Sequence, residues 1–208
     1  MDTSMYYTKY IFLLLLSVLI FGCAQEIQQD NIPDRQDEST TEPQQRDIST
    51  SEAEFSRYKE AISYLSSNNF DKAQSILLEF TQQRPELAGP WVNLGLIKLK
   101  QNDFDSAEKL INTALKKNPE LPQALNLMAT IRIHQGKIII AEQLYKKSIA
   151  LKPNYPLAHY NLALLYDIYL QNIPEAIVHY ATYLELSKEN DTSTREWLEQ
   201  LKASQSKG

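Results

Sequence analysis

The feature of this sequence that most limits its fold is a return of like residues every 34 positions. Proline recurs at this interval in one column, and small residues recur in two others. Proline stops a helix, and small residues let two helices approach closely. Such a period is typical of a repeat array in which each repeat is one supersecondary element. The three columns are Pro85, Pro119 and Pro153; Ala61, Gly95, Ala129 and Ala163; and Ala73, Ala107 and Ala141.

Each period contains two stretches with helical spacing of apolar residues, separated by a short polar segment. In the second period, Trp91, Leu94 and Gly95 mark the first helix, and the second carries Ala107, Leu110, Ile111, Ala114 and Leu115. The intervening segments place Asn68, Asn102 and Gly136 in one column. Asparagine and glycine tolerate the left-handed conformation in which helices often end. Each period is therefore predicted to be a helix, a tight turn and a second helix.

Trp91, Leu94, Gly95, Ala107 and Pro119 together resemble the tetratricopeptide repeat (TPR). The resemblance implies an all-α fold, a right-handed α-solenoid of four helix-turn-helix repeats with a concave groove. The repeats are predicted at residues 54–87, 88–121, 122–155 and 156–190.

Two repeats depart from the pattern. The fourth is one residue longer, and the turn in YLQNIPEA is expected to absorb the extra residue, with Pro174 in the first helical turn. The first carries Arg57 and Glu60 where later repeats have Trp91 and Leu94. Polar residues are expected in a terminal repeat, because one of its faces has no neighbour.

Residues 191–208 are predicted to form a capping helix and a tail. Ser193 and Glu196 have the spacing of a capping box. Trp197, Leu198 and Leu201 form an apolar stripe that is expected to cover the end of the last repeat.

The N-terminal segment is typical of a secretory signal. Lys9 precedes a short apolar run from Tyr10 to Phe21. This run is too short to cross a bilayer, because a spanning helix needs about 20 apolar residues. Either Met1 or Met5 fits as the start. The sequence Ile20–Phe21–Gly22–Cys23 resembles the lipobox of bacterial lipoproteins, which implies cleavage of a signal peptide (residues 1–22) and acylation of Cys23, for example with palmitate. An uncleaved anchor and a plain secreted protein are the alternatives.

Cys23 is the only cysteine of the chain, so no disulfide is expected. In lipoproteins an aspartate after the cysteine favours the inner membrane, and here Ala24 stands there. The resemblance therefore implies the outer membrane, facing the periplasm of a bacterial cell envelope. Residues 23–53 are then the lipidated cysteine and a glutamine-rich acidic linker, predicted to be disordered because it has too little apolar surface to fold. A spacer is its expected role, and a binding tail is the alternative.

The residue inventory argues against catalysis. The chain has five glycines and no glycine-rich phosphate loop. No histidine has metal-site spacing, so we expect no enzyme activity, metal, cofactor or small-molecule substrate. His159 shares the column of Trp91 and Leu125, which favours a packing role, whereas His179 is expected at a surface or interface.

Nucleic acid is not an expected partner either, because the chain has a net charge of -5. Lys116 and Lys117, and Lys146 and Lys147 in the next repeat, are interpreted as residues at helix ends, where cations favour the dipole.

The remaining function is recognition of a protein or peptide, and the TPR resemblance implies which columns face the groove. These columns hold Tyr58, Ile62, Val92, Asn93, Leu96, Asn126, Thr130, Tyr160, Asn161 and Leu164. The alternative for Leu96 and Leu164 is packing between helices. A TPR site that clamps a terminal carboxylate needs basic residues, where this chain has Tyr58, Gln123 and Leu127. A mostly uncharged segment is therefore the expected partner, either a peptide or a helix.

The combination of lipobox, linker and repeats resembles the small lipoproteins that assist assembly of type IV pili or secretin channels. A scaffold for cell-wall synthesis or envelope maintenance enzymes is a second interpretation. An envelope hydrolase is the third, and the missing catalytic constellation argues against it.

Overall fold

The computed structural model describes residues 45–187 and 190–206. The predicted signal peptide, Cys23 and the linker up to residue 44 lie outside these residues. The described residues form nine α-helices and a π-helical segment, without a strand. The predicted all-α class, with helix-turn-helix repeats and a final helix, is confirmed. The chain divides after Asp103 into two compact units, called here the N-terminal and C-terminal units.

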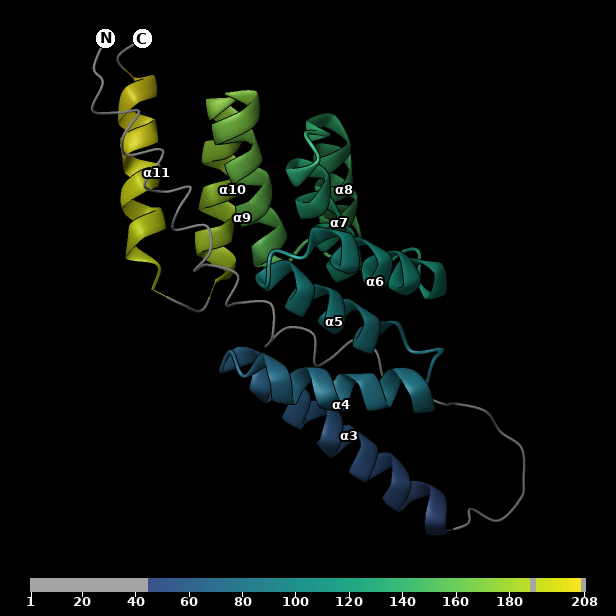
Figure 1. The fold of residues 1–208 in the computed structure, drawn as a ribbon. Coiled ribbons are helices and arrows are strands. Elements are labelled where there is room, and N and C mark those ends of the chain that lie inside the picture. Colours follow the sequence, from purple (N-terminus) through teal and green to yellow (C-terminus); the bar gives the residue numbers. More distant parts are fainter. Residues whose placement is uncertain (1–44, 188–189, 207–208) are drawn as a thin grey trace. The chain divides into compact units, whose positions relative to one another are not determined.

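The described residues of the N-terminal unit, 45–103, form three helices (Figure 1). They are α3 (Gln45–Ser66), α4 (Phe70–Gln83) and α5 (Ala88–Lys100). α4 packs on both α3 and α5. Its buried side is formed by Ala73, Ile76, Leu77 and Phe80, spaced along one face of the helix.

The start of α3 differs from the predicted linker boundary. The helix begins at Gln45, whereas disorder was predicted up to residue 53. Pro43 is the last proline before it, and neither proline nor glycine occurs between Gln45 and Ser66. Nothing in residues 45–53 therefore stops the helix from extending backwards from the first repeat.

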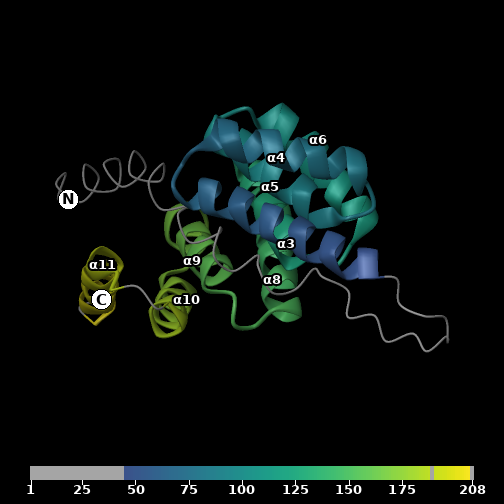
Figure 2. The same ribbon diagram turned by 90° about the horizontal axis from the view of Figure 1, so that it is seen from below.

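The C-terminal unit contains the remaining helices, in which each element packs on the next (Figures 1 and 2). They are α6 (Phe104–Lys117), α7 (Pro122–His134), α8 (Ile138–Leu151), α9 (Pro156–Leu164), the π-helical η2 (Leu165–Leu170), α10 (Ile173–Leu186) and α11 (Thr192–Gln205).

The small-residue columns lie where the prediction placed them, in the interior. Ala61, Ala129 and Ala163 are fully buried in the first helices. The fully buried small residues of the second helices are Ala73, Ala107, Ala141 and Ala176. Each proline of the proline column comes shortly after the end of a helix, at α4, α6 and α8. These two residue types thus fix both the spacing and the length of the helices.

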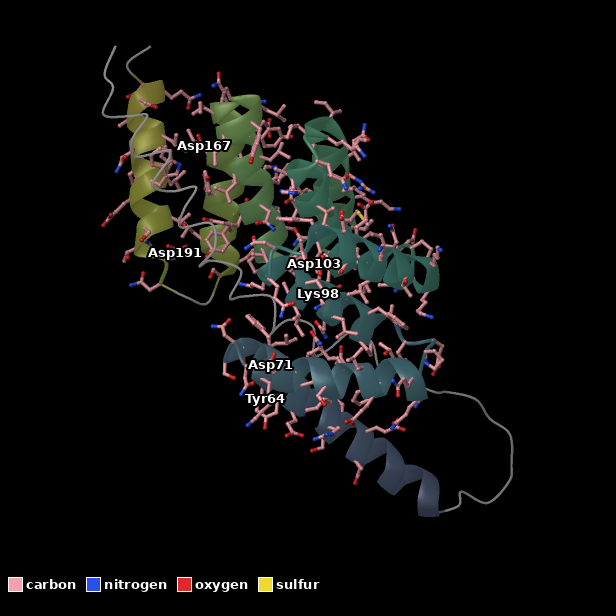
Figure 3. The ribbon with its side chains drawn as sticks, in the orientation of Figure 1. Tyr64, Asp71, Lys98, Asp103, Asp167 and Asp191 are labelled. Carbon is pink, nitrogen blue, oxygen red and sulfur yellow. The ribbon has the colours of Figure 1, made fainter. Side chains whose placement is uncertain are left out.

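The turns within the repeats share one geometry. Asn68, Asn102 and Gly136 have φ values of 57°, 59° and 72°, as the sequence predicts. In the first repeat the amide of Asn69 donates to the carbonyl of Tyr64, and in the second the amide of Asp103 donates to that of Lys98. Figure 3 labels residues beside these turns, including Tyr64, Asp71, Lys98 and Asp103. The hydrogen bonds are those of a helix that ends in a left-handed residue.

The extra residue of the fourth repeat is absorbed in the helix, so the prediction that the turn would absorb it is wrong. In the first three repeats the closing hydrogen bond spans five residues, as from Lys137 to Arg132. In the fourth it spans six, from Asn172 to Tyr166, and encloses most of η2. A π-helical turn takes one more residue than an α-helical turn. Two residues, Gln171 and Asn172, separate η2 from α10, and Gln171 takes the left-handed position at φ 51°.

The predicted capping box of the last helix is also wrong. The N-cap of α11 is Asp191, whose carboxylate accepts from the Thr194 amide at 2.9 Å and from the Thr194 hydroxyl at 2.7 Å. A carboxylate at this position accepts a hydrogen bond from an otherwise unpaired amide, and its negative charge is stabilised by the positive end of the helix dipole. Leu198 and Leu201 are buried and Trp197 is half-buried. α11 packs on α10, the last helix of the fourth repeat.

Candidate partner-binding surface

The ten predicted groove residues divide by burial. Tyr58, Thr130 and Asn161 are half-buried. The other residues, which lie in the interior, are Ile62, Val92, Asn93, Leu96, Asn126, Tyr160 and Leu164. The packing alternative therefore describes Leu96 and Leu164 in this structure. Contact of any of the ten with a partner stays a prediction.

In the N-terminal unit, the amide of Asn93 links α5 to α3. Its Nδ2 donates to the hydroxyl of Tyr58 at 2.7 Å, and the Tyr58 ring lies edge-on to Phe80. Burial raises the pKa of Tyr58 well above its ordinary value, against the effect of the Asn93 hydrogen bond. The phenol therefore stays protonated and neutral, and it acts as a hydrogen-bonding group in an apolar contact.

The C-terminal unit has an equivalent link between α9 and α7. Asn161 Nδ2 donates to Asn126 Oδ1 at 3.1 Å. The two partners are 35 residues apart, as are Asn93 and Tyr58. Thr130 lies one turn after Asn126, and its hydroxyl is 3.0 Å from that of Tyr145 on α8. Within each unit, the two first helices are thus joined by polar side chains in the same columns of the repeat.

Three amide atoms on these helices have no hydrogen-bond partner in the described structure. They are Asn93 Oδ1 in the N-terminal unit, and Gln123 Oε1 and Asn126 Nδ2 in the C-terminal unit. An unsatisfied buried polar group costs about 1 to 3 kcal/mol, and such groups are uncommon. The set contains two acceptors and one donor, which are the groups that pair with a peptide backbone.

A second polar link in the C-terminal unit involves two histidines. His159 Nε2 lies 3.0 Å from the carbonyl oxygen of Pro153, and its Nδ1 lies 3.0 Å from His179 Nδ1. Because a carbonyl only accepts, His159 carries its proton on Nε2, and His179 then donates from Nδ1. Burial lowers the pKa of His179, and the nearby His159 lowers it further.

The His159 contact has a counterpart in the second repeat. Trp91 Nε1 donates to the carbonyl of Pro85 at 3.3 Å, over the same separation of six residues. His159 thus replaces the tryptophan as a ring N–H donor to the proline column. The packing role expected for His159 agrees with its burial. Sequence reasoning missed its pairing with His179, although both residues fall in repeats with a known frame.

Two acidic side chains of the C-terminal unit, Glu108 and Glu142, are held in ion pairs. Arg132 donates to Glu108 at 2.6 Å, and this hydrogen bond lowers the pKa of Glu108. Lys146 does the same for Glu142, and the hydroxyl of Tyr166 donates to the same carboxylate oxygen. Both carboxylates therefore stay ionised near neutral pH. Arg132 joins α7 to α6 and Tyr166 joins η2 to α8, whereas Lys146 pairs with Glu142 within α8.

The three positions that correspond to the basic residues of a carboxylate clamp hold Tyr58, Gln123 and Leu127, none of which is a cation. Gln123 and Leu127 are buried in α7, and Tyr58 is half-buried in α3. Within residues 45–187 and 190–206 there is also no cluster of three side chains suited to a metal ion. No helix in that part of the chain has the length and hydropathy needed to span a bilayer.

Comparison with known proteins identifies the fold. Residues 56–131 match a family model described as a tetratricopeptide repeat. The sequence matches no curated protein. TTC0263, a thermophilic TPR protein of Thermus thermophilus, is 19% identical with a TM-score of 0.60, over 71% of this chain and 80% of that one.

Two further solved structures are similar. PilF of Pseudomonas aeruginosa is 18% identical with a TM-score of 0.64, over 76% of this chain and 72% of that one. The first TPR of Spaghetti, bound to the HSP90 peptide SRMEEVD, is 22% identical with a TM-score of 0.51. It covers 57% of this chain and 93% of its own. At these identities the likeness shows the fold, which is that of a TPR solenoid.

Proposed function

We propose that this chain is a non-catalytic TPR scaffold that binds a peptide or a helix of another protein along its first helices. The observation that carries the proposal is the set of unsatisfied amide atoms in the groove columns, above all Asn126 Nδ2. A partner that supplied a carbonyl oxygen there would recover the free energy lost by leaving the donor unpaired.

The C-terminal unit offers the best-defined contact point. Asn126 is buried, but Asn161, which donates to it, is half-buried, and so is Thr130 on the next turn of α7. A partner would therefore meet Asn161 and Thr130 first. Rotation of the Asn161 amide would then give it access to Asn126. The half-buried Tyr58 beside Asn93 offers a similar entry in the N-terminal unit.

The chemistry of this surface favours a partner with few charges. The groove columns hold apolar, hydroxylic and amide side chains, and clamp positions 58, 123 and 127 lack lysine and arginine. The Spaghetti structure shows that a TPR of this fold holds a peptide, there an acidic one. We propose instead that backbone hydrogen bonds to asparagine, together with apolar contacts, hold the partner of this chain.

We also propose that Cys23 carries a lipid that tethers the scaffold to the outer membrane, and that its partner belongs to a pilus or secretin assembly. The resemblance of residues 20–23 to a lipobox and the acidic segment that follows support this placement. Cys23→Ser is expected to release the protein from membranes or to leave its signal peptide uncleaved. Retention of a cleaved Cys23→Ser variant in the membrane would contradict the anchor.

Photo-crosslinking in cells tests the binding surface. A photoreactive amino acid at position 161 is expected to give a specific crosslinked partner, because this side chain is half-buried beside the unpaired amide. The matched control is position 112, an exposed asparagine on α6 outside the groove columns. The same products from both positions, or none from position 161, would contradict the assignment.

A further inference from the structure

The exposed side of α8 differs from the exposed sides of the two preceding second helices. We define the outer face of α8 by six exposed residues on one side of the helix: Ile139, Ile140, Gln143, Lys147, Ala150 and Leu151. The same columns in α4 hold Asp71, Lys72, Ser75, Glu79, Gln82 and Gln83. In α6 they hold Asp105, Ser106, Lys109, Thr113, Lys116 and Lys117. Only polar residues occupy those columns, whereas four of the six are apolar in α8.

Packing within the unit does not account for these apolar residues. α8 contacts α7 and α9 through its opposite side, where Ala141, Tyr145 and Ser148 are buried. Ile139 and Ile140 remain 57% and 46% exposed. An apolar group of this kind on an otherwise polar surface is typical of an interaction site.

Lys146 and Lys147 were predicted to lie at the end of their helix, where cations favour the dipole. This prediction is wrong for α8. The last turn of α8 has no basic residue, whereas Lys116 and Lys117 do lie in the last turn of α6. Lys146 pairs with Glu142 at 2.7 Å, and this hydrogen bond raises the pKa of Lys146. Lys147 lies on the outer face beside it. The cation of the outer face is therefore Lys147, which lies between the apolar residues at the two ends of the face.

Three kinds of partner could cover this face: a second copy of the chain, a lipid surface or a helix of another protein. The order of its side chains argues against the first two. A second copy of the chain, paired through α8, would bring the lysines of both copies together, and like charges at an interface are unfavourable. A lipid surface needs a continuous apolar stripe along the helix, which Gln143 and Lys147 interrupt. A helix with carboxylates between two apolar ends matches both the charge and the order.

We propose that the outer face of α8 is a second docking site, distinct from the groove, for an acidic amphipathic helix of another protein. The apolar ends of the face lie 11 residues apart, which corresponds to about 16 Å along a helix. A partner of roughly three turns covers this length. In the centre of the face, Lys147 would pair with a carboxylate of the partner, between the apolar contacts at the two ends.

Fluorescence anisotropy with the purified full chain and a labelled peptide tests this site. The probe is a helical peptide of about 15 residues with leucines near both ends and two glutamates between them. A second probe has lysines in place of the glutamates. We expect the acidic probe to bind at least about tenfold more tightly than the basic one. Added salt should weaken its binding, because salt screens the contact between lysine and carboxylate.

Variants that copy the other repeats keep the protein folded while they change the face. Ile139→Asp with Ile140→Ser reproduces α6, and Lys147→Thr does the same in the centre. Each is expected to weaken binding of the acidic probe about tenfold. Leu78→Asn, which removes an exposed leucine from α4, should leave the affinity unchanged. Asn161→Ala should also leave it unchanged, which separates this site from the groove.

Three results would overturn the proposal. The first is equal binding of both probes, or binding that the α8 variants do not change while circular dichroism shows them folded. The second is binding of vesicles containing anionic phosphatidylglycerol but not of the acidic peptide, which would assign the face to a lipid surface. The third is a dimer in sedimentation that Ile139→Asp dissociates, which would assign it to a second copy.

Discussion

At the scale of single residues, the left-handed turn positions are the most predictable part of the chain. Asn68, Asn102 and Gly136 were placed from their column alone, because few residues tolerate a positive φ. Gln171 could not be placed in this way, since the extra residue of the fourth repeat moves it out of the column. It has φ 51° without the advantage that asparagine or glycine would have there.

Gln171→Gly is therefore expected to stabilise the protein by about 1 kcal/mol, because glycine has no β-carbon to disfavour the left-handed conformation. The matched control is Gln101→Gly. Gln101 also lies at the end of a helix, but its φ of -85° is an ordinary one, so its replacement should not stabilise. Chemical unfolding of both variants measures the difference. A gain at position 101 equal to that at 171 would contradict this account.

At the scale of elements, the helices and their pairing were predictable, whereas their inner polar contacts were not. Periodicity predicted which helices exist. It did not show that the extra residue of the fourth repeat would lie in η2, because the sequence does not distinguish an insertion in the helix from one in the turn. Asp191 was missed as the cap of α11 because Ser193 and Glu196 offered a competing pattern two residues later. The amide links at 35-residue spacing were visible in the frame, yet their burial depends on packing.

The docking of α11 depends on a polar contact as well as on apolar burial. Trp197 Nε1 donates at 2.8 Å to Asp167 Oδ2, a carboxylate buried in η2 (Figure 3). The hydroxyl of Tyr180 also approaches this oxygen, at 3.4 Å. Because a buried carboxylate needs its donors, loss of the indole N–H should cost more here than at an uncharged acceptor.

Trp197→Phe keeps most of the ring but removes the donor, so it is expected to lower the free energy of unfolding by about 1.5 to 3 kcal/mol. Trp197→Ala should cost more, since the ring contact is lost as well. The control is Trp91→Phe, which loses a bond to the Pro85 carbonyl and should cost about 0.5 to 1.5 kcal/mol. Thermal and denaturant unfolding provide the comparison. Equal costs for the two phenylalanine variants would show that the Asp167 contact does not dock α11.

At the scale of the whole molecule, the sequence was sufficient for the class of fold and for the repeat frame, because both follow from residue types at fixed intervals. It was not sufficient for the groove. The columns that resemblance assigns to a partner mostly hold residues that are interior in each unit, as Val92 and Tyr160 are. A column shows which helix a residue belongs to, whereas its exposure depends on the neighbours packed around it.

The most direct test of the scaffold account is the dissociation constant of the partner captured through position 161, measured with the purified chain. Asn126→Ala removes the unsatisfied donor and should weaken binding at least about tenfold. Asn112→Ala, at an exposed asparagine outside the groove columns, should leave the constant unchanged. An Asn126→Ala variant that is folded and binds as tightly as the wild type would contradict the account, because the amides would then take no part in recognition.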